Sequence, residues 1–99
     1  MFETLEEELE NLCSSIDYRI DKKLVGSPFG ETRKKLVNEL ARDLDEAQGL
    51  LPQLESEARM APHPYRVELM SRIRKHRESL SKLSNKYRRT LADFGDSGR

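Results

Sequence analysis

Apolar residues recur along this chain with the spacing of amphipathic helices, in three segments separated by two breaks. The first break, residues 25–30, contains two glycines and a proline, and the second, residues 61–64, contains two prolines. Proline lacks a backbone donor and disfavours helix in the residue before it, while glycine frees the backbone. We therefore predict three helices, over about residues 2–24, 31–60 and 64–94.

Within each segment the apolar positions step by three or four residues, which keeps them on one face of a helix. In the first segment these positions are Phe2, Leu5, Leu9, Leu12, Ile16 and Ile20. In the second they are Leu36, Leu40, Leu44, Ala47, Leu51, Leu54 and Ala58, with Val37 and Leu50 widening the stripe. In the third they are Leu69, Ile73, His76, Leu80, Leu83, Tyr87, Leu91 and Phe94.

Three amphipathic helices joined by short links bury their stripes most economically against one another. This predicts an all-α fold, an antiparallel up-down-up three-helix bundle over residues 1–94, with residues 95–99 as a flexible tail or linker. The first and third helices then run parallel, so that the acidic start of the first lies beside the basic start of the third.

Two local features qualify the helix boundaries. Gly49 and Pro52 interrupt the second segment, but the spacing of its apolar residues continues in phase on both sides. We therefore expect one helix that is kinked near Pro52. The alternative is a break that would give four helices. At the start of the chain, Thr4 and Glu7 have the spacing of a capping box.

The formal net charge is zero, so no overall field attracts nucleic acid or membrane, but the distribution is uneven. Residues 1–17 hold six acids and no base, whereas residues 66–89 hold nine bases and two acids. There is no basic-then-apolar signal peptide and no apolar run of the roughly 20 residues that span a bilayer. We expect no membrane insertion from this chain.

The residues that carry chemistry are sparse. Cys13, His63 and His76 are far apart in sequence and lie on different predicted elements, so we expect no metal site. No nucleophile–base–orienting-group constellation and no phosphate-cradling glycine motif is present, and we expect neither enzymatic activity nor a cofactor. His76 lies in an apolar stripe, where a half-buried ring whose polar edge reaches solvent or a backbone group is the simplest expectation.

The basic third helix is the strongest signal outside the core. Its candidate partner-binding residues are Arg72, Lys75, Lys82, Lys86 and Arg89. A solubilising face that the first helix partly neutralises is the simplest interpretation. A dock for an acidic protein surface is the first functional alternative, ahead of anionic lipid and of nucleic acid, for which exposed aromatic residues and net positive charge are missing.

About half of the chain resembles a known family. The pattern is carried by Leu44-Asp45-Glu46-Ala47, Leu50-Leu51, Leu54, Glu57-Ala58-Arg59 and Pro62, then Arg72-Ile73-Arg74, His76-Arg77, Leu80, Lys82-Leu83 and Tyr87-Arg88-Arg89. It resembles the N-terminal domain of the Vti-type vesicle-transport SNAREs of the Qb class, a bundle that is spectrin-like in style. The chain departs from the family at His76, where the family often has Tyr, and at Pro52, where it usually has a helix former.

The resemblance implies a regulatory and sorting domain that acts in vesicle trafficking and membrane fusion. Such a domain precedes a SNARE motif and a C-terminal membrane anchor, neither of which is present, so the chain would be an N-terminal fragment. Its implied partners are epsin-related adaptors and, through the missing motif, other SNAREs. It would be monomeric and lie on the cytosolic face of Golgi, trans-Golgi network, endosomal or vacuolar membranes. A self-associating structural coiled coil or a helical module of a tethering complex is the alternative.

Overall fold

The computed structural model of the chain describes residues 1–27 and 30–93. The described residues form α1 (Phe2–Tyr18), η1 (Arg19–Leu24), α2 (Glu31–Arg59) and α3 (His63–Asp93), without a strand. The all-α three-helix prediction is therefore confirmed. Pro28 and Phe29 of the first break, Phe94 of the third stripe and the expected tail 95–99 lie outside the described residues.

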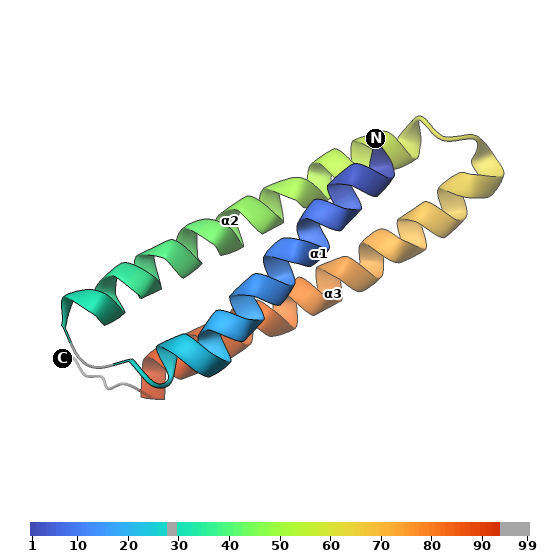
Figure 1. Cartoon of the computed structure of the whole chain (residues 1–99). Helices are drawn as coiled ribbons and strands as arrows, with labels where there is room; N and C mark the ends of the chain where they lie inside the picture. The colour runs from blue at the N-terminus through green and yellow to red at the C-terminus, as the bar shows by residue number, and fades with distance from the viewer. Residues whose placement is uncertain (28–29, 94–99) are drawn as a thin grey trace.

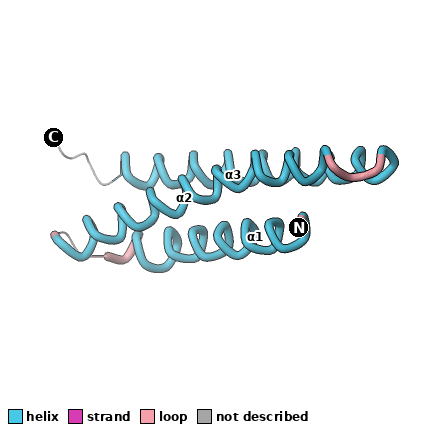
Figure 2. The backbone as a smooth tube through the Cα atoms, turned by 90° about the horizontal axis from the view of Figure 1, so that it is seen from above, coloured by secondary structure: helices cyan, strands magenta, loops and turns pink. Residues whose placement is uncertain are grey.

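The helices form a rod of 51 × 19 × 18 Å. α2 and α3 run antiparallel, and α1 packs along the pair in the same direction as α3 (Figure 1). Seen from above, α1 lies beside the pair formed by the two longer helices (Figure 2). The predicted stripes meet in one core that extends along the whole rod, from Phe2 and Ala58 at one end to Leu24 and Leu40 at the other.

α1 begins one turn earlier than the proposed capping box requires. The amide of Leu5 donates to the carbonyl of Met1 at 3.2 Å, and no side chain caps the helix. Phe2 is buried, and a helix that started after Thr4 would leave its ring off the core stripe. The capping box was therefore a wrong prediction. The N-terminal ammonium group instead lies 3.2 Å from the Glu57 carboxylate of α2.

The first helix changes its winding after Tyr18. η1 is a π-helical turn, and the amide of Val25 donates to the carbonyl of Ile20, five residues earlier, at 3.2 Å. Ile16, Ile20 and Leu24 are four residues apart, and in an α-helix each such step would rotate the side chain by about 40° from the stripe. The wider π turn reduces this drift, and all three side chains are fully buried.

α2 is continuous through Pro52, so the alternative of a broken second helix was wrong. The proline is exposed, and its ring faces away from the core. The helix therefore loses one hydrogen bond at a place where water can satisfy the free carbonyl. A bend at this position stays a prediction. α2 is preceded by Gly30 at its N-cap position, whose φ of 114° and ψ of −152° belong to a region that only glycine enters readily.

Candidate partner-binding surface

α1 and α3 are joined by an ion-pair cluster near the start of α1. Arg72 of α3 forms a two-pronged pair with Glu6, in which Nε donates to Oε2 at 3.1 Å and Nη2 donates to Oε1. The His76 Nε2 atom lies 2.8 Å from Glu6 Oε2. The guanidinium also stands 5.3 Å from the centre of the Phe2 ring. The expected meeting of the acidic and basic helix starts is thus observed in atomic detail.

Burial and charge act in opposite directions on the central carboxylate. The Glu6 side chain is 12% exposed, and burial alone would favour its neutral form. The Arg72 hydrogen bond outweighs this effect and, with a smaller contribution from His76, holds the pKa of Glu6 below its ordinary value. The same contact raises the pKa of Arg72. Glu6 is therefore a buried anion at neutral pH, neutralised by the third helix.

A second ionic link joins the other ends of these helices. The Lys86 ammonium lies 2.7 Å from Oδ1 of Asp17 in α1 and 2.7 Å from Oδ1 of Asp21 in η1. The Asp17 and Asp21 hydrogen bonds raise the pKa of Lys86. Two of the five candidate binding residues, Arg72 and Lys86, are thus engaged within the bundle.

Glu6, Glu10 and His76 also form the one group with metal-ligand spacing among the described residues. Their ligand atoms lie within 4.8 Å of one another. Two carboxylates and an imidazole can bind a divalent cation. However, Arg72 already bonds to both oxygens of Glu6, and a metal would have to displace that guanidinium. An ion-pair network describes this group better than a metal centre, and His76 pairs with a carboxylate rather than with solvent or backbone.

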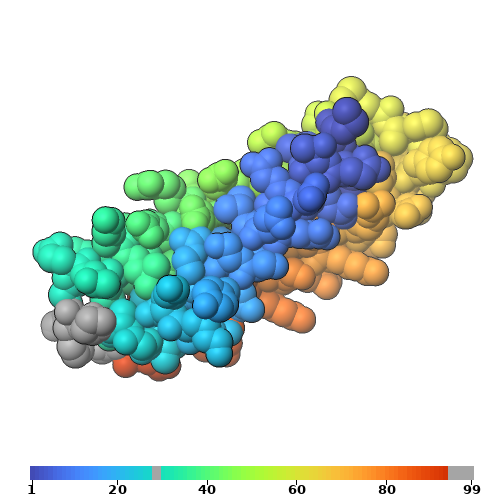
Figure 3. Space-filling view, in the orientation of Figure 1, coloured from blue at the N-terminus to red at the C-terminus, as the bar shows by residue number. Residues whose placement is uncertain are grey.

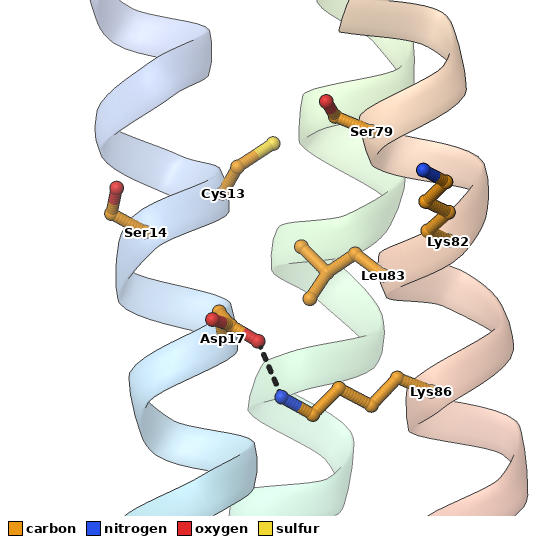
Figure 4. A pocket seen from close by; sticks show the side chains of 7 residues that line it. All are labelled: Cys13, Ser14, Asp17, Ser79, Lys82, Leu83 and Lys86. Atoms are coloured by element: carbon orange, nitrogen blue, oxygen red, sulfur yellow. Dashed lines mark hydrogen bonds and ion pairs between the residues drawn. The ribbon is translucent and has the colours of Figure 1, made fainter.

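A shallow hollow of about 360 Å³ lies between α1 and α3, midway along the rod. Cys13 and Leu83 point into it from facing helices, and Asp17 and Lys86 close its lower edge (Figure 4). Burial, with a smaller contribution from the nearby Glu10 charge, raises the pKa of the Cys13 thiol, so that the thiol stays protonated and unreactive at neutral pH. The hollow thus carries an apolar floor and a charged rim.

The remaining candidates form a row on the exposed side of α3, and Lys82 of this row also lines the hollow beside α1. Lys75, Lys82 and Arg89 are seven residues apart, which is close to two helical turns, so their side chains leave the same side of the helix. All three are exposed, and within residues 1–27 and 30–93 none of them forms an ion pair. We call these three residues the outward row.

Comparison with known protein families assigns this bundle to one of them. The family described as the vesicle transport v-SNARE protein N-terminus matches residues 1–91, which include all of the three-helix bundle except the last two residues of α3. The chain belongs to this family. The v-SNARE family is a family of trafficking proteins rather than enzymes.

A curated relative supports the same assignment. The v-SNARE N-terminal domain is 30% identical over 82 residues to "Vesicle transport through interaction with t-SNAREs homolog 1A" of Dictyostelium discoideum. The match covers 83% of this chain but 36% of the relative. The chain therefore spans about a third of the length of that protein. No solved structure matches. No helix in the described part of the v-SNARE domain has the length and apolar character needed to cross a membrane.

Sequence reasoning missed the acidic side of both ionic links. Glu6 and Asp17 were counted only as members of the acidic run of residues 1–17, and Asp21 was not singled out. In the structure Glu6 is buried and the two aspartates bind Lys86. One signal was available: His76 occupies a core position of α3, and a polar ring in such a position needs a polar partner.

Proposed function

We propose that this v-SNARE N-terminal domain is a regulatory and sorting module that presents the outward row to an acidic surface of a trafficking protein. The observation that carries the proposal is the division among the five basic candidates. Arg72 and Lys86 stabilise the bundle, whereas Lys75, Lys82 and Arg89 are exposed without an internal counter-ion in the described chain. Unpaired cations along one face attract an acidic partner and set its orientation.

The geometry of the outward row suits a rigid, elongated contact. Fourteen residues separate Lys75 from Arg89, and at about 1.5 Å per residue the row extends over roughly 21 Å. The row belongs to a helix held by two neighbours, so the charges keep their spacing when a partner binds. Adaptors of the epsin-related class are the partners that we propose.

The parent protein supplies the rest of the proposed role. We propose, from the family resemblance, that the parent protein carries a SNARE motif and a C-terminal anchor; the name of the longer relative describes vesicle transport through interaction with t-SNAREs. It would act in fusion at Golgi, trans-Golgi network, endosomal or vacuolar membranes, with this domain on the cytosolic face. The apolar stripes are buried within one chain, which favours a monomer over a self-associating coiled coil or a tethering-complex module.

The test compares two charge-reversal variants in binding and sorting. One variant carries Lys75→Glu, Lys82→Glu and Arg89→Glu, and the control carries three reversals at exposed bases elsewhere, Arg42→Glu, Arg59→Glu and Arg66→Glu. The first is expected to lose the recovery of adaptors from cytosol and the sorting of the parent protein, while the control keeps both. Equal behaviour of the two variants would remove the support for the outward row.

Sedimentation of the 99-residue chain tests the alternative. At physiological salt, where attraction between surface charges is screened, a concentration-independent monomer is expected. A dimer that persists at high salt would instead favour the self-associating coiled coil.

A further inference from the structure

The charges of the rod are separated along its length. Asp17 contacts Lys86, Arg19 contacts Asp43, and the Tyr87 hydroxyl donates to the Val37 carbonyl, so residues 17–43 and 82–93 share one half of the rod. The described part of that half holds eleven bases and six acids, and the other half, residues 1–16 and 44–81, holds six bases and eleven acids. A chain without net charge thus has a basic half and an acidic half.

Four lysines concentrate the positive charge at the tip of the basic half. Lys22 and Lys23 lie on η1, and Lys34 and Lys35 lie on the first turns of α2. All four are exposed, and none forms an ion pair within the described residues. The nearby Asp21 is already bound to Lys86. We call these four lysines the basic end; their elements form the cyan-to-green end of the surface in Figure 3.

Exposed apolar side chains and a hollow lie at the same end of the rod as these lysines. Tyr18 is 56% and Val25 is 59% exposed at the same end of the rod. A hollow of about 630 Å³ opens between η1 and α2, and its lining includes Lys23, Lys35 and the hydroxyl-bearing Thr32. Lysines with long apolar stems beside an exposed tyrosine and valine match the chemistry of a membrane–water interface.

From this placement we infer that the basic end docks on an anionic bilayer surface, with the long axis of the rod directed away from the membrane. Anionic lipid headgroups are mobile and adjust to lysines that are spread over two elements, whereas a folded acidic protein would need carboxylates fixed at matching positions. The acidic half, directed away, would avoid repulsion from the negative surface. This inference is independent of the proposed function, because the basic end and the outward row share no residue.

Vesicle flotation at low salt tests the inference with two variants of equal net charge. The basic-end variant carries Lys22→Gln, Lys23→Gln, Lys34→Gln and Lys35→Gln. The control carries Arg59→Gln, Arg66→Gln, Arg74→Gln and Arg77→Gln, four exposed bases of the acidic half that lie outside the outward row. Circular dichroism establishes that both are folded.

The wild type is expected to bind phosphatidylcholine vesicles that contain phosphatidylserine or a phosphoinositide, and not phosphatidylcholine alone. Each lysine that reaches the surface contributes about a fivefold gain in affinity, so the basic-end variant should lose well over tenfold. The control should bind as the wild type does, and rising salt should weaken both. Absence of wild-type binding, or equal losses in the two variants, would overturn the inference. If the wild type binds no vesicles and the basic-end variant fails to capture adaptors, these lysines would instead be assigned to a protein partner.

A fluorescent reporter tests the orientation. The chain has no tryptophan, and Val25 and the 64% exposed Val67 lie at opposite ends of the rod. Brominated anionic lipids are expected to quench a Val25→Trp variant and to leave a Val67→Trp variant unquenched. Equal quenching of both would contradict end-on docking.

Discussion

The contact between Glu6 and Arg72 is expected to hold the start of α1 on α3, and a double-mutant cycle measures its strength. The variants are Glu6→Gln, Arg72→Gln and the combination of both. Glutamine removes the charge while keeping a side chain of similar length and polarity, so the cycle reports the charged contact more than packing. Glu7→Gln and Arg74→Gln, at exposed positions of the same helices, are the matched controls.

The magnitude follows from the geometry. Arg72 makes two hydrogen bonds to the carboxylate, and hydrogen bonds to charged groups contribute about 1.5–3 kcal/mol. The Arg72 side chain is 36% exposed, and solvent screening moves the value toward the lower end of this range. We therefore expect a coupling free energy of about 1–2 kcal/mol at neutral pH.

The two single variants should differ. Arg72→Gln leaves the carboxylate buried with His76 as its remaining partner, so its free energy of unfolding should fall by about 2 kcal/mol. Glu6→Gln should lose about 1 kcal/mol, because the guanidinium can turn to water and to Glu68, 3.7 Å away. For a chain of this size, 2 kcal/mol corresponds to a fall in melting temperature of about 10 °C.

Urea unfolding followed by far-UV circular dichroism measures these values, and pH gives an internal check. The pKa of Glu6 is lower in the folded protein than its ordinary value of 4.5. Its contribution is therefore complete above pH 4.5 and is lost as the pH falls through the lower folded-state pKa. The wild type and Glu6→Gln should converge in stability in acid. A coupling below about 0.3 kcal/mol at neutral pH, or one that persists unchanged in acid, would refute the reasoning.

Four further substitutions test the backbone and the second ionic link. Gly49→Ala should raise the free energy of unfolding by about 1 kcal/mol, because position 49 is exposed in a helix interior with open space around it. Gly30→Ala should lower the free energy of unfolding by about 1–3 kcal/mol, because Gly30 has a positive φ. Denaturant midpoints that shift in the same direction for both variants would contradict this reasoning. Pro52→Ala should stabilise α2 by about 1–3 kcal/mol by restoring a ladder hydrogen bond, and an unchanged denaturation midpoint would show that the proline costs nothing here. At low salt, Lys86→Gln should lower the free energy of unfolding by up to about 1 kcal/mol, seen as a lower melting temperature, while Lys82→Gln leaves both unchanged. Equal effects of the two variants would show that the ion pairs of Lys86 with α1 and η1 do not stabilise the bundle.

The architecture was predictable because the spacing of apolar residues within each helix shows which face of that helix is buried. The stripes of α1, α2 and α3 became one core. Pro52 illustrates why the periodic argument outweighed local propensity: the ring falls on the exposed side, where a missing donor is least costly. The polarity of the bundle also followed from the sequence, because parallel first and third helices bring Glu6 toward Arg72.

Other features depend on how the helices rotate against one another. Five glutamates crowd the start of α1, and their spacing alone does not identify Glu6 as the one that α3 covers. The same holds for the basic candidates, because Lys86 finds Asp17 and Asp21 only once η1 and α3 are in register. The π turn itself had a local signal in the successive four-residue steps to Leu24, which exceed the α-helical period.

The separation of charge along the rod has a consequence for how copies of the protein meet one another. Two copies of a rod with a positive half and a negative half attract each other when the positive end of one meets the negative end of the other. Because the net charge is zero, this attraction acts only at short range. In concentrated solutions of low ionic strength such rods would line up end to end, and added salt would separate them because the attraction is screened beyond about 10 Å. Association of this type leaves the apolar stripes inside each bundle, in contrast to a coiled coil, in which the stripes themselves form the contact.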